Sequence, residues 1–157
     1  MTHVRPRSPL TFACLILCMS QFVLVLAQDS QSRALTFEGV VRPMSEIAKI
    51  RKIAGDSEPL AGLMALETKD GRAIPLLSDE GGRMFYLDEA MRGRQVRLKL
   101  IERPDFPVAE VIQSEVMHEG RWRVPQYYCD VCTIAVRYPQ VCLCCQGPME
   151  FRYRPER

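Results

Sequence analysis

The sequence has little net charge, few histidines and a single tryptophan, and these shortages exclude several classes of function. Of its 157 residues, 21 are Lys or Arg and 19 are Asp or Glu, which gives a formal net charge of +2. Because basic and acidic residues are nearly equal in number, the chain lacks the excess positive charge that attracts nucleic acid or an anionic membrane surface. His118 is the only histidine after the first 27 residues, and no catalytic partner stands beside it. We therefore expect His118 to be a surface residue near a turn.

Three motifs that carry enzyme chemistry are also missing. Gly81-Gly82 is not followed by the Lys-Ser/Thr of a phosphate-binding loop. Thr133 follows Cys132 where a haem-attachment motif would have histidine. No serine stands in a nucleophile elbow. These absences favour a protein that is not an enzyme.

Residues 1–27 have the pattern of a secretory signal peptide. Arg5 and Arg7 form a basic start, and the mostly apolar run of residues 10–27 follows them. The run ends in Val25-Leu26-Ala27, whose residues at −3 and −1 suit signal peptidase, so the pattern predicts cleavage after Ala27. We therefore expect a secreted or periplasmic protein.

An uncleaved membrane anchor is the alternative for this segment. Eighteen residues are close to the minimum that spans hydrocarbon, and Ser20 and Gln21 interrupt the run. Cleavage would remove Arg5 and Arg7 and leave 19 basic against 19 acidic residues. The cleaved chain is therefore expected to bind neither nucleic acid nor membrane. Its oligomeric state stays open.

The middle of the chain predicts short strands joined by turns. After a polar linker at 28–34, the clearest strand is 95–103, where apolar and polar residues alternate with period two. Lys69-Asp70-Gly71 is typical of a hairpin turn. Asp88 predicts the cap of a short helix that Gly93 ends.

The order of strand, hairpin, short helix, alternating strand, turn and final strand over residues 35–120 resembles the OB-fold. The stretch EAMRGRQVRLKLIERPDFPVAEVIQSEV carries the resemblance. It implies a mainly β protein with a small, partly closed five-stranded barrel. It also implies one alternative function, a module that binds a ligand or a partner strand.

Residues 121–157 form a cysteine-rich ribbon with a basic tail. Five cysteines fall within 17 residues, and two pairs have C-x-x-C spacing: Cys129 with Cys132, and Cys142 with Cys145. Two cysteines three apart on a tight turn can direct both sulfurs at one ion, and a second turn alongside completes a tetrahedron. The spacing therefore predicts a four-thiolate metal site, with Cys144 as an alternative ligand.

This segment resembles the zinc-ribbon and rubredoxin-like class at Cys129, Cys132, Cys142 and Cys145. The resemblance implies a short metal-binding β-hairpin. In such sites each C-x-x-C turn, or knuckle, often has a glycine directly after its second cysteine. Here Thr133 follows Cys132 and Gln146 follows Cys145 instead. The ending YYCDVC…CLCCQGPME also looks like the tails of small uncharacterised secreted proteins of planctomycete-type bacteria, a likeness that implies no activity.

The chemistry of the cysteines has three alternatives. Four thiolates suit zinc first and then iron or copper(I), and a closed four-sulfur site would make the metal structural rather than catalytic. Export instead favours disulfides, although five cysteines leave one unpaired. A thiol-disulfide or metal-transfer protein would use Cys142, Cys144 and Cys145. The leading prediction is an exported, non-enzymatic zinc protein that could present its ribbon to a protein partner.

Overall fold

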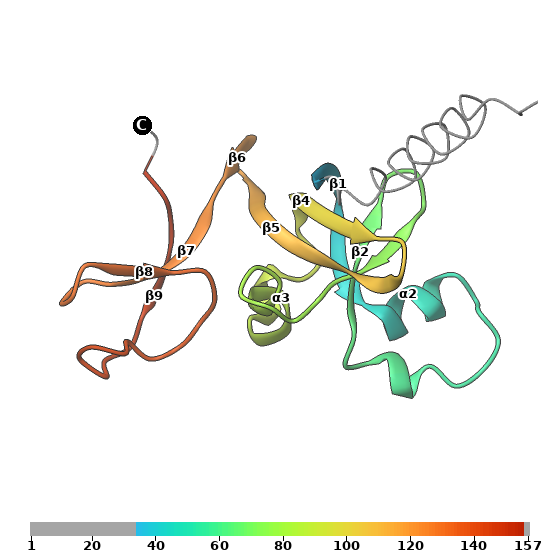
Figure 1. Ribbon diagram of the computed structural model, residues 1–157, viewed down its shortest axis with the longest axis horizontal. Coiled ribbons are helices and arrows are strands. Elements are labelled where there is room, and N and C mark those ends of the chain that lie inside the picture. The colour runs from blue at the N-terminus through green and yellow to red at the C-terminus, as the bar shows by residue number, and fades with distance from the viewer. Residues whose placement is uncertain (1–33, 156–157) are drawn as a thin grey trace, which may run out of the picture. The chain divides into compact units, whose positions relative to one another are not determined.

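The computed structural model describes residues 34–155, and these form a mainly β protein within one compact unit (Figure 1). The predicted signal peptide at 1–27 and all of the predicted 28–34 linker except its last residue lie outside the described residues. No helix in the described part of the chain is long and apolar enough to cross a bilayer.

The main sheet contains six antiparallel strands in the order β3-β2-β1-β4-β5-β6. The strands are β1 (Ala34–Pro43), β2 (Met64–Thr68), β3 (Ala73–Pro75), β4 (Gln95–Arg103), β5 (Phe106–His118) and β6 (Arg121–Arg123). The predicted strand at 95–103 is confirmed as β4, and its alternation has the expected cause. Val96, Leu98 and Leu100 are fully buried on one face, because successive side chains of a strand point to opposite sides.

Four short helices lie between the strands. They are α2 (Met44–Ile50), η1 (Glu58–Leu60), α3 (Arg83–Leu87) and η2 (Glu89–Met91). The predicted cap is confirmed, since Asp88 Oδ1 accepts a hydrogen bond of 2.9 Å from the Ala90 N–H at the start of η2. Helix α3 buries Met84 and Phe85 in the same apolar core as the inward side chains of β1, β2, β4 and β5. The core therefore lies inside the curved main sheet, with α3 against it.

The described strands form no closed barrel, so the predicted OB-like barrel is confirmed only as a mainly β fold of antiparallel sheets. Strand β3 is only three residues long and ends at Pro75. Beyond it, a single parallel bridge pairs Leu76 with Ala109 of β5, and the Leu77 N–H donates to the Ala109 carbonyl at 2.8 Å. A barrel needs a continuous ladder at this seam, and one bridge does not supply it.

A sixth strand also separates the structure from the prediction. Glu119 and Gly120, with φ of 50° and 77°, form the turn that reverses the chain from β5 into β6. Positive φ at both central residues is the geometry of a tight hairpin turn. The main sheet therefore extends to Arg123.

The glycine pair at 81–82 permits a close approach between the loop before α3 and strand β5. A Cβ on Gly81 would lie 1.7 Å from the Val111 carbonyl oxygen, and one on Gly82 would lie 2.1 Å from the Leu77 oxygen. Both glycine N–H groups donate to Asp79 Oδ1, at 3.0 and 2.8 Å. These glycines are therefore required by packing.

The C-terminal residues form a second sheet of three antiparallel strands in the order β8-β7-β9. The strands are β7 (Pro125–Cys129), β8 (Ile134–Val136) and β9 (Glu150–Tyr153). A hairpin was predicted here, and the third strand comes from the segment expected to be a basic tail. Strand β9 pairs with β7, and Phe151 lies opposite Tyr127 with the two ring centroids 5.6 Å apart, edge to face, which stabilises the pairing of the strands.

Side chains connect the two sheets. The Tyr127 hydroxyl on β7 donates to Asp88 Oδ2 at 2.5 Å. The Arg83 guanidinium of α3 lies 4.8 Å from the centre of the Tyr138 ring, and Arg94 donates to the Tyr153 hydroxyl at 2.6 Å. Burial, and then the neighbouring Asp88 carboxylate, raises the pKa of Tyr127 well above its usual value. Tyr127 therefore stays a neutral donor.

Candidate metal centre

The first knuckle begins where strand β7 ends. Cys129 is the last residue of β7 and pairs with Ile134, the first residue of β8. The chain must therefore reverse within Cys129–Thr133, and Cys132 lies on this turn. The reversal closes at Thr133, which has φ of 56°. This local geometry brings the second cysteine of the pair back toward the first.

The second knuckle lies in the connection between β8 and β9. The Gln146 N–H donates to the Cys142 carbonyl at 2.8 Å, and the Cys142 N–H donates to the Gly147 carbonyl at 2.9 Å. Gln146 has φ of 59°, and it follows Cys145 as Thr133 follows Cys132. The glycines that the sequence lacks are thus replaced by two non-glycine residues in the left-handed conformation.

The two knuckles present their first sulfur to backbone donors in the same way. Cys142 Sγ accepts hydrogen bonds from the N–H groups of Cys145 and Cys144. Cys129 Sγ accepts from the N–H groups of Cys132 and Val131. Donors of this kind stabilise negative charge on sulfur, which is the state in which a cysteine binds a metal. The repeated pattern indicates two preformed thiolate turns.

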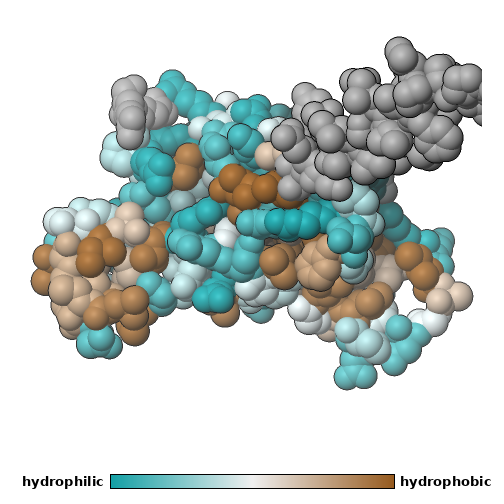
Figure 2. Space-filling view, in the orientation of Figure 1, coloured by the Kyte–Doolittle hydropathy of each residue, from teal (hydrophilic) through white to brown (hydrophobic). Residues whose placement is uncertain are grey.

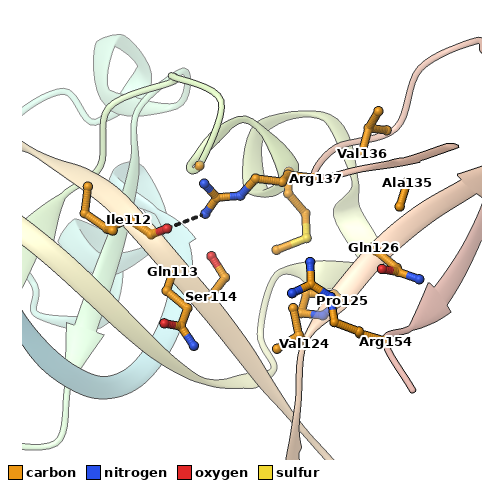
Figure 3. A pocket seen from close by; sticks show the side chains of 12 residues that line it. Ile112, Gln113, Ser114, Val124, Pro125, Gln126, Ala135, Val136, Arg137 and Arg154 are labelled. Carbon is orange, nitrogen blue, oxygen red and sulfur yellow. Dashed lines mark hydrogen bonds between the residues drawn. The ribbon is translucent and has the colours of Figure 1, made fainter. Parts of the chain in front are cut away.

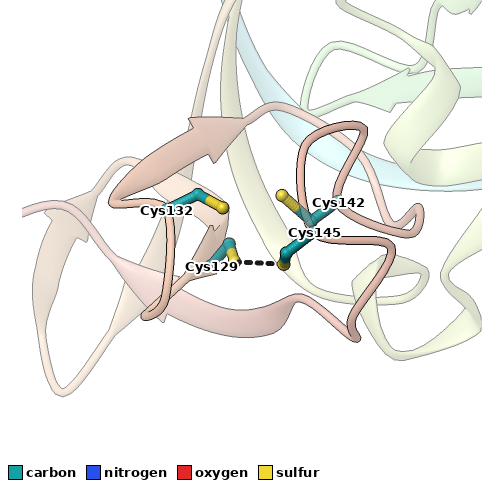
Figure 4. A group of neighbouring side chains, drawn as sticks. All are labelled: Cys129, Cys132, Cys142 and Cys145. Carbon is teal, nitrogen blue, oxygen red and sulfur yellow. Dashed lines mark hydrogen bonds between the residues drawn. The ribbon is translucent and has the colours of Figure 1, made fainter.

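The structure brings the four predicted sulfurs together. The sulfur atoms of Cys129, Cys132, Cys142 and Cys145 all lie within 4.8 Å of one another (Figure 4). Cys129 and Cys145, one from each knuckle, are 3.5 Å apart. Bonds of about 2.3 Å from zinc to sulfur place the sulfurs of a tetrahedron about 3.8 Å apart. The donor set and its spacing therefore fit a metal ion.

The sulfur environments differ in electrostatics. The N–H groups of Cys145 and Cys144 lower the pKa of Cys142 to about 6. The pKa of Cys132 is raised, first by a hydrogen bond with the Cys144 thiol and then by burial. For Cys129 the Cys132 N–H lowers the pKa, but burial and the thiols of Cys145 and Cys142 outweigh it and leave the pKa raised. Crowded sulfurs resist shared negative charge unless a cation lies between them.

Cys144 lies beside the group of four but does not belong to it. Its side chain is exposed and lies within hydrogen-bond reach of Cys132. Cys129 and Cys142 are buried, Cys132 is half-buried and Cys145 is exposed. The structure therefore separates Cys144 from Cys145, two adjacent residues that the sequence leaves as alternative ligands.

An ion cluster that the sequence did not predict holds the first knuckle against strand β9. Arg152 on β9 forms ion pairs with Asp130 of the knuckle and with Glu150 Oε2 at 3.0 Å. Its guanidinium also lies 5.1 Å from the centre of the Tyr128 ring. The hydrogen bonds that Arg152 donates to Glu150 and then to Asp130 raise the pKa of Arg152. No sequence pattern marks this cluster, because its members are up to 22 residues apart.

His118 is not part of the cysteine group. Its ring stacks on Tyr153 with centroids 4.4 Å apart, and its Nε2 lies 3.8 Å from Glu119 Oε1. Trp122 likewise belongs to the main sheet, where the Arg97 guanidinium lies 4.3 Å from the centre of its ring. Of the aromatic residues that flank the cysteines, Tyr127 makes the buried contact between the two sheets.

The left-handed residues that close the knuckles give a testable prediction. A β-branched residue with positive φ is strained, whereas glycine adopts this conformation freely. We expect Thr133→Gly to stabilise the fold by about 0.5–1 kcal/mol, since relief of roughly 1–2 kcal/mol of strain exceeds the entropy that glycine adds to the unfolded chain. Gln146→Gly, which removes no β-branch, should stabilise less.

Thermal unfolding of both variants beside the parent protein measures these effects. The Thr133→Gly midpoint should be the highest of the three. A midpoint below that of the parent would show that Thr133 does not occupy the left-handed region.

The fold and the site define a mainly β protein with a four-cysteine cluster that could hold a metal ion. No family model, no curated protein and no solved structure matches this chain. The resemblances to the OB-fold and to planctomycete-type tails therefore stay predictions.

Proposed function

We propose that this chain is an exported, non-enzymatic protein whose C-terminal segment binds one structural zinc ion through Cys129, Cys132, Cys142 and Cys145. One observation carries the proposal: two knuckles with the same backbone geometry direct four sulfurs into a space less than 5 Å across. Backbone N–H groups already donate hydrogen bonds to the first sulfur of each pair, in Cys129 and in Cys142.

Zinc is the metal that this donor set favours. A tetrahedral arrangement of four thiolates suits zinc, and after it iron or copper(I). Four protein ligands leave no open coordination position for water or substrate. The ion would therefore stabilise the fold and would not take part in hydrolysis, which supports a non-enzymatic role.

The composition of the C-terminal segment supports a structural role for the ion. Its buried apolar residues in the described part of the chain are Pro125, Tyr127, Cys129 and Cys142. Val131 and Leu143, one in each knuckle, are 82% and 78% exposed. Figure 2 shows apolar side chains gathered on the surface around β8 and β9. A segment with so small a core needs a cross-link, and a bound ion supplies one.

For the main sheet we propose an OB-type arrangement. The strand order β3-β2-β1-β4-β5, the helix α3 between β3 and β4, and the parallel bridge from Leu76 to Ala109 support it. A partly open five-stranded barrel with one weak seam is the form in which this fold occurs. Strand β6 would then be an extension of it.

Export is proposed from the sequence alone. The basic start, the apolar run of residues 10–27 and the small residues before Gln28 support cleavage after Ala27. The boundaries at 1–27, 28–34, 35–120 and 121–157 are proposed on the same basis.

A thiol-disulfide or metal-transfer protein is the second candidate. It is favoured by the exposed thiol of Cys144 beside Cys132, and by the 3.5 Å separation of the Cys129 and Cys145 sulfurs. Such a protein would exchange disulfides with a model substrate and would lose this activity when Cys144 or Cys145 is replaced. A structural zinc protein would show no exchange.

Intact-mass measurement under native conditions, on protein recovered from outside the cytosol, tests the proposal. We expect a chain that begins at Gln28, one zinc per chain, and one thiol that alkylates readily without chelator. A chain that begins at Met1 would contradict cleavage after Ala27, favour the uncleaved anchor and leave the metal site standing. Two disulfides and no metal would contradict the zinc site.

A further inference from the structure

A pocket of about 380 Å³ lies where the C-terminal sheet meets strand β5. Its walls come from β5, from α3 and the loop before it, and from residues in or next to each of the strands β7, β8 and β9. The volume falls within the usual range for small-molecule sites. None of the four clustered cysteines lines it, so it is distinct from the proposed metal centre.

The charged residues that line this pocket are all of one sign. Arg137 follows β8 and Arg154 follows β9, and no Asp or Glu is present in the lining. Arg137 donates one hydrogen bond, of 2.9 Å, to the Ile112 carbonyl. A guanidinium has five N–H donors, so most of those on Arg137 remain for a ligand. The Arg154 guanidinium has no hydrogen bond or ion pair within the described residues.

A buried hydroxyl without a partner faces the same space. Ser114 is only 7% exposed, and its Oγ makes no hydrogen bond among the described residues. In Figure 3 the Ser114 hydroxyl and the Arg137 and Arg154 side chains come from three elements and converge on one opening. A buried hydroxyl without a partner is unfavourable, so such a group indicates a missing binding partner.

A β-bulge in strand β5 creates this arrangement. Lys99 pairs with Gln113 and Leu100 pairs with Val111, so Ile112 is an extra residue without a partner on β4. The bulge turns the Ile112 carbonyl out of the ladder, where it accepts from Arg137. It thereby fixes the guanidinium near Ser114. Bulges are frequent at functional sites.

We propose that this pocket binds a small organic anion whose carboxylate or phosphate head contacts Arg137, Arg154 and Ser114. The forked guanidinium geometry suits both heads, because each offers two oxygens in one plane. The volume exceeds what the head needs, and Met84, Val124 and Val136 provide an apolar wall for the body of the ligand. The proposal needs the C-terminal sheet folded but does not depend on which metal holds it.

Isothermal titration of the mature, metal-loaded protein with hexanoate and with hexyl phosphate tests the proposal, and neutral hexanamide is the control ligand. At least one anion should bind, and at least tenfold more tightly than hexanamide. Arg137→Gln and Arg154→Gln should each weaken binding by about tenfold to a hundredfold, the usual effect of one charge-assisted hydrogen bond. Comparison of the affinities for hexanoate and hexyl phosphate shows whether the pocket prefers a carboxylate or a phosphate head.

Arg51→Gln is the matched control variant, because Arg51 pairs with Glu67 outside this pocket, and binding to it should change less than about twofold. Ser114→Ala should weaken binding while it leaves the unliganded protein at least as stable, since the deleted hydroxyl has no partner. Equal binding by the Arg137→Gln/Arg154→Gln variant, equal binding of hexanamide, or no binding of either anion would overturn the proposal.

Discussion

Replacement of Cys129 by alanine is expected to abolish metal binding and to unfold the C-terminal sheet, while the six-stranded sheet stays folded. Cys129 ends the central strand of that sheet and is buried. Its sulfur also accepts hydrogen bonds from the N–H groups of Val131 and Cys132, which shape the first knuckle. The substitution therefore removes a ligand and a turn at once.

The size of the effect follows from the energy of metal binding. Structural zinc sites contribute about 10–16 kcal/mol, which averages roughly 2.5–4 kcal/mol for each of four ligands. Loss of one ligand alone then weakens metal affinity by about 60-fold to 700-fold, and loss of the turn weakens it further. The small apolar core around Tyr127 would not keep the sheet folded without the ion.

Cys144→Ala is the matched control, because Cys144 lies on the same knuckle as Cys142 and Cys145 but outside the group of four sulfurs. We expect this variant to keep about one zinc per chain. Metal content by elemental analysis and amide hydrogen exchange of β7, beside exchange of β4, measure both outcomes. Full metal content in Cys129→Ala, or metal loss in Cys144→Ala, would contradict the assigned ligand set.

Gly81→Ala should destabilise the main sheet by about 3–5 kcal/mol, the upper range for a single substitution. Its Cβ would lie 1.7 Å from the Val111 oxygen and 2.8 Å from the Val111 carbonyl carbon, both of them backbone atoms of β5. No side-chain rotation relieves such a clash. The loop would have to leave β5, which would break the hydrogen bonds to Asp79 and the seam between Leu77 and Ala109.

Gly62→Ala is the control for this substitution. Nothing lies within 4 Å of a Cβ at Gly62, and its φ is not in the left-handed region. Its stability should change by less than about 0.5 kcal/mol, as at an ordinary surface position. Urea unfolding of both variants with metal in excess gives the comparison. Equal midpoints for Gly81→Ala and the parent protein would show that Gly81 does not contact β5.

Local sequence patterns predicted the elements that depend on neighbouring residues. The alternation over residues 95–103 predicted β4, and Asp88 predicted the start of η2. Both signals lie within a few residues, because strand alternation and helix capping are local effects. The third strand of the C-terminal sheet was missed. Phe151 and Tyr153 are too few to signal a strand until β7 pairs with them.

The sequence also predicted which cysteines converge, but not how the knuckles close. The C-x-x-C spacing predicted two turns, and the four sulfurs do approach one another. The conformations of Thr133 and Gln146 could not be predicted, because the usual signal for positive φ is glycine. The buried Ser114 hydroxyl without a hydrogen-bond partner could not be predicted either, since a serine in a strand gives no signal until its surroundings are known.

The sequence by itself determined that four thiols can approach one another at the C-terminus, because cysteines at fixed spacing on short turns can point in few directions. It also determined the main strands, since alternation along one segment is enough to bury one face. Only the tertiary structure decided that β3 meets β5 at one bridge, and that Arg137, Arg154 and Ser114 share a pocket. These features join segments up to 40 residues apart in the chain, and such contacts depend on how whole strands pair and bulge rather than on any local pattern.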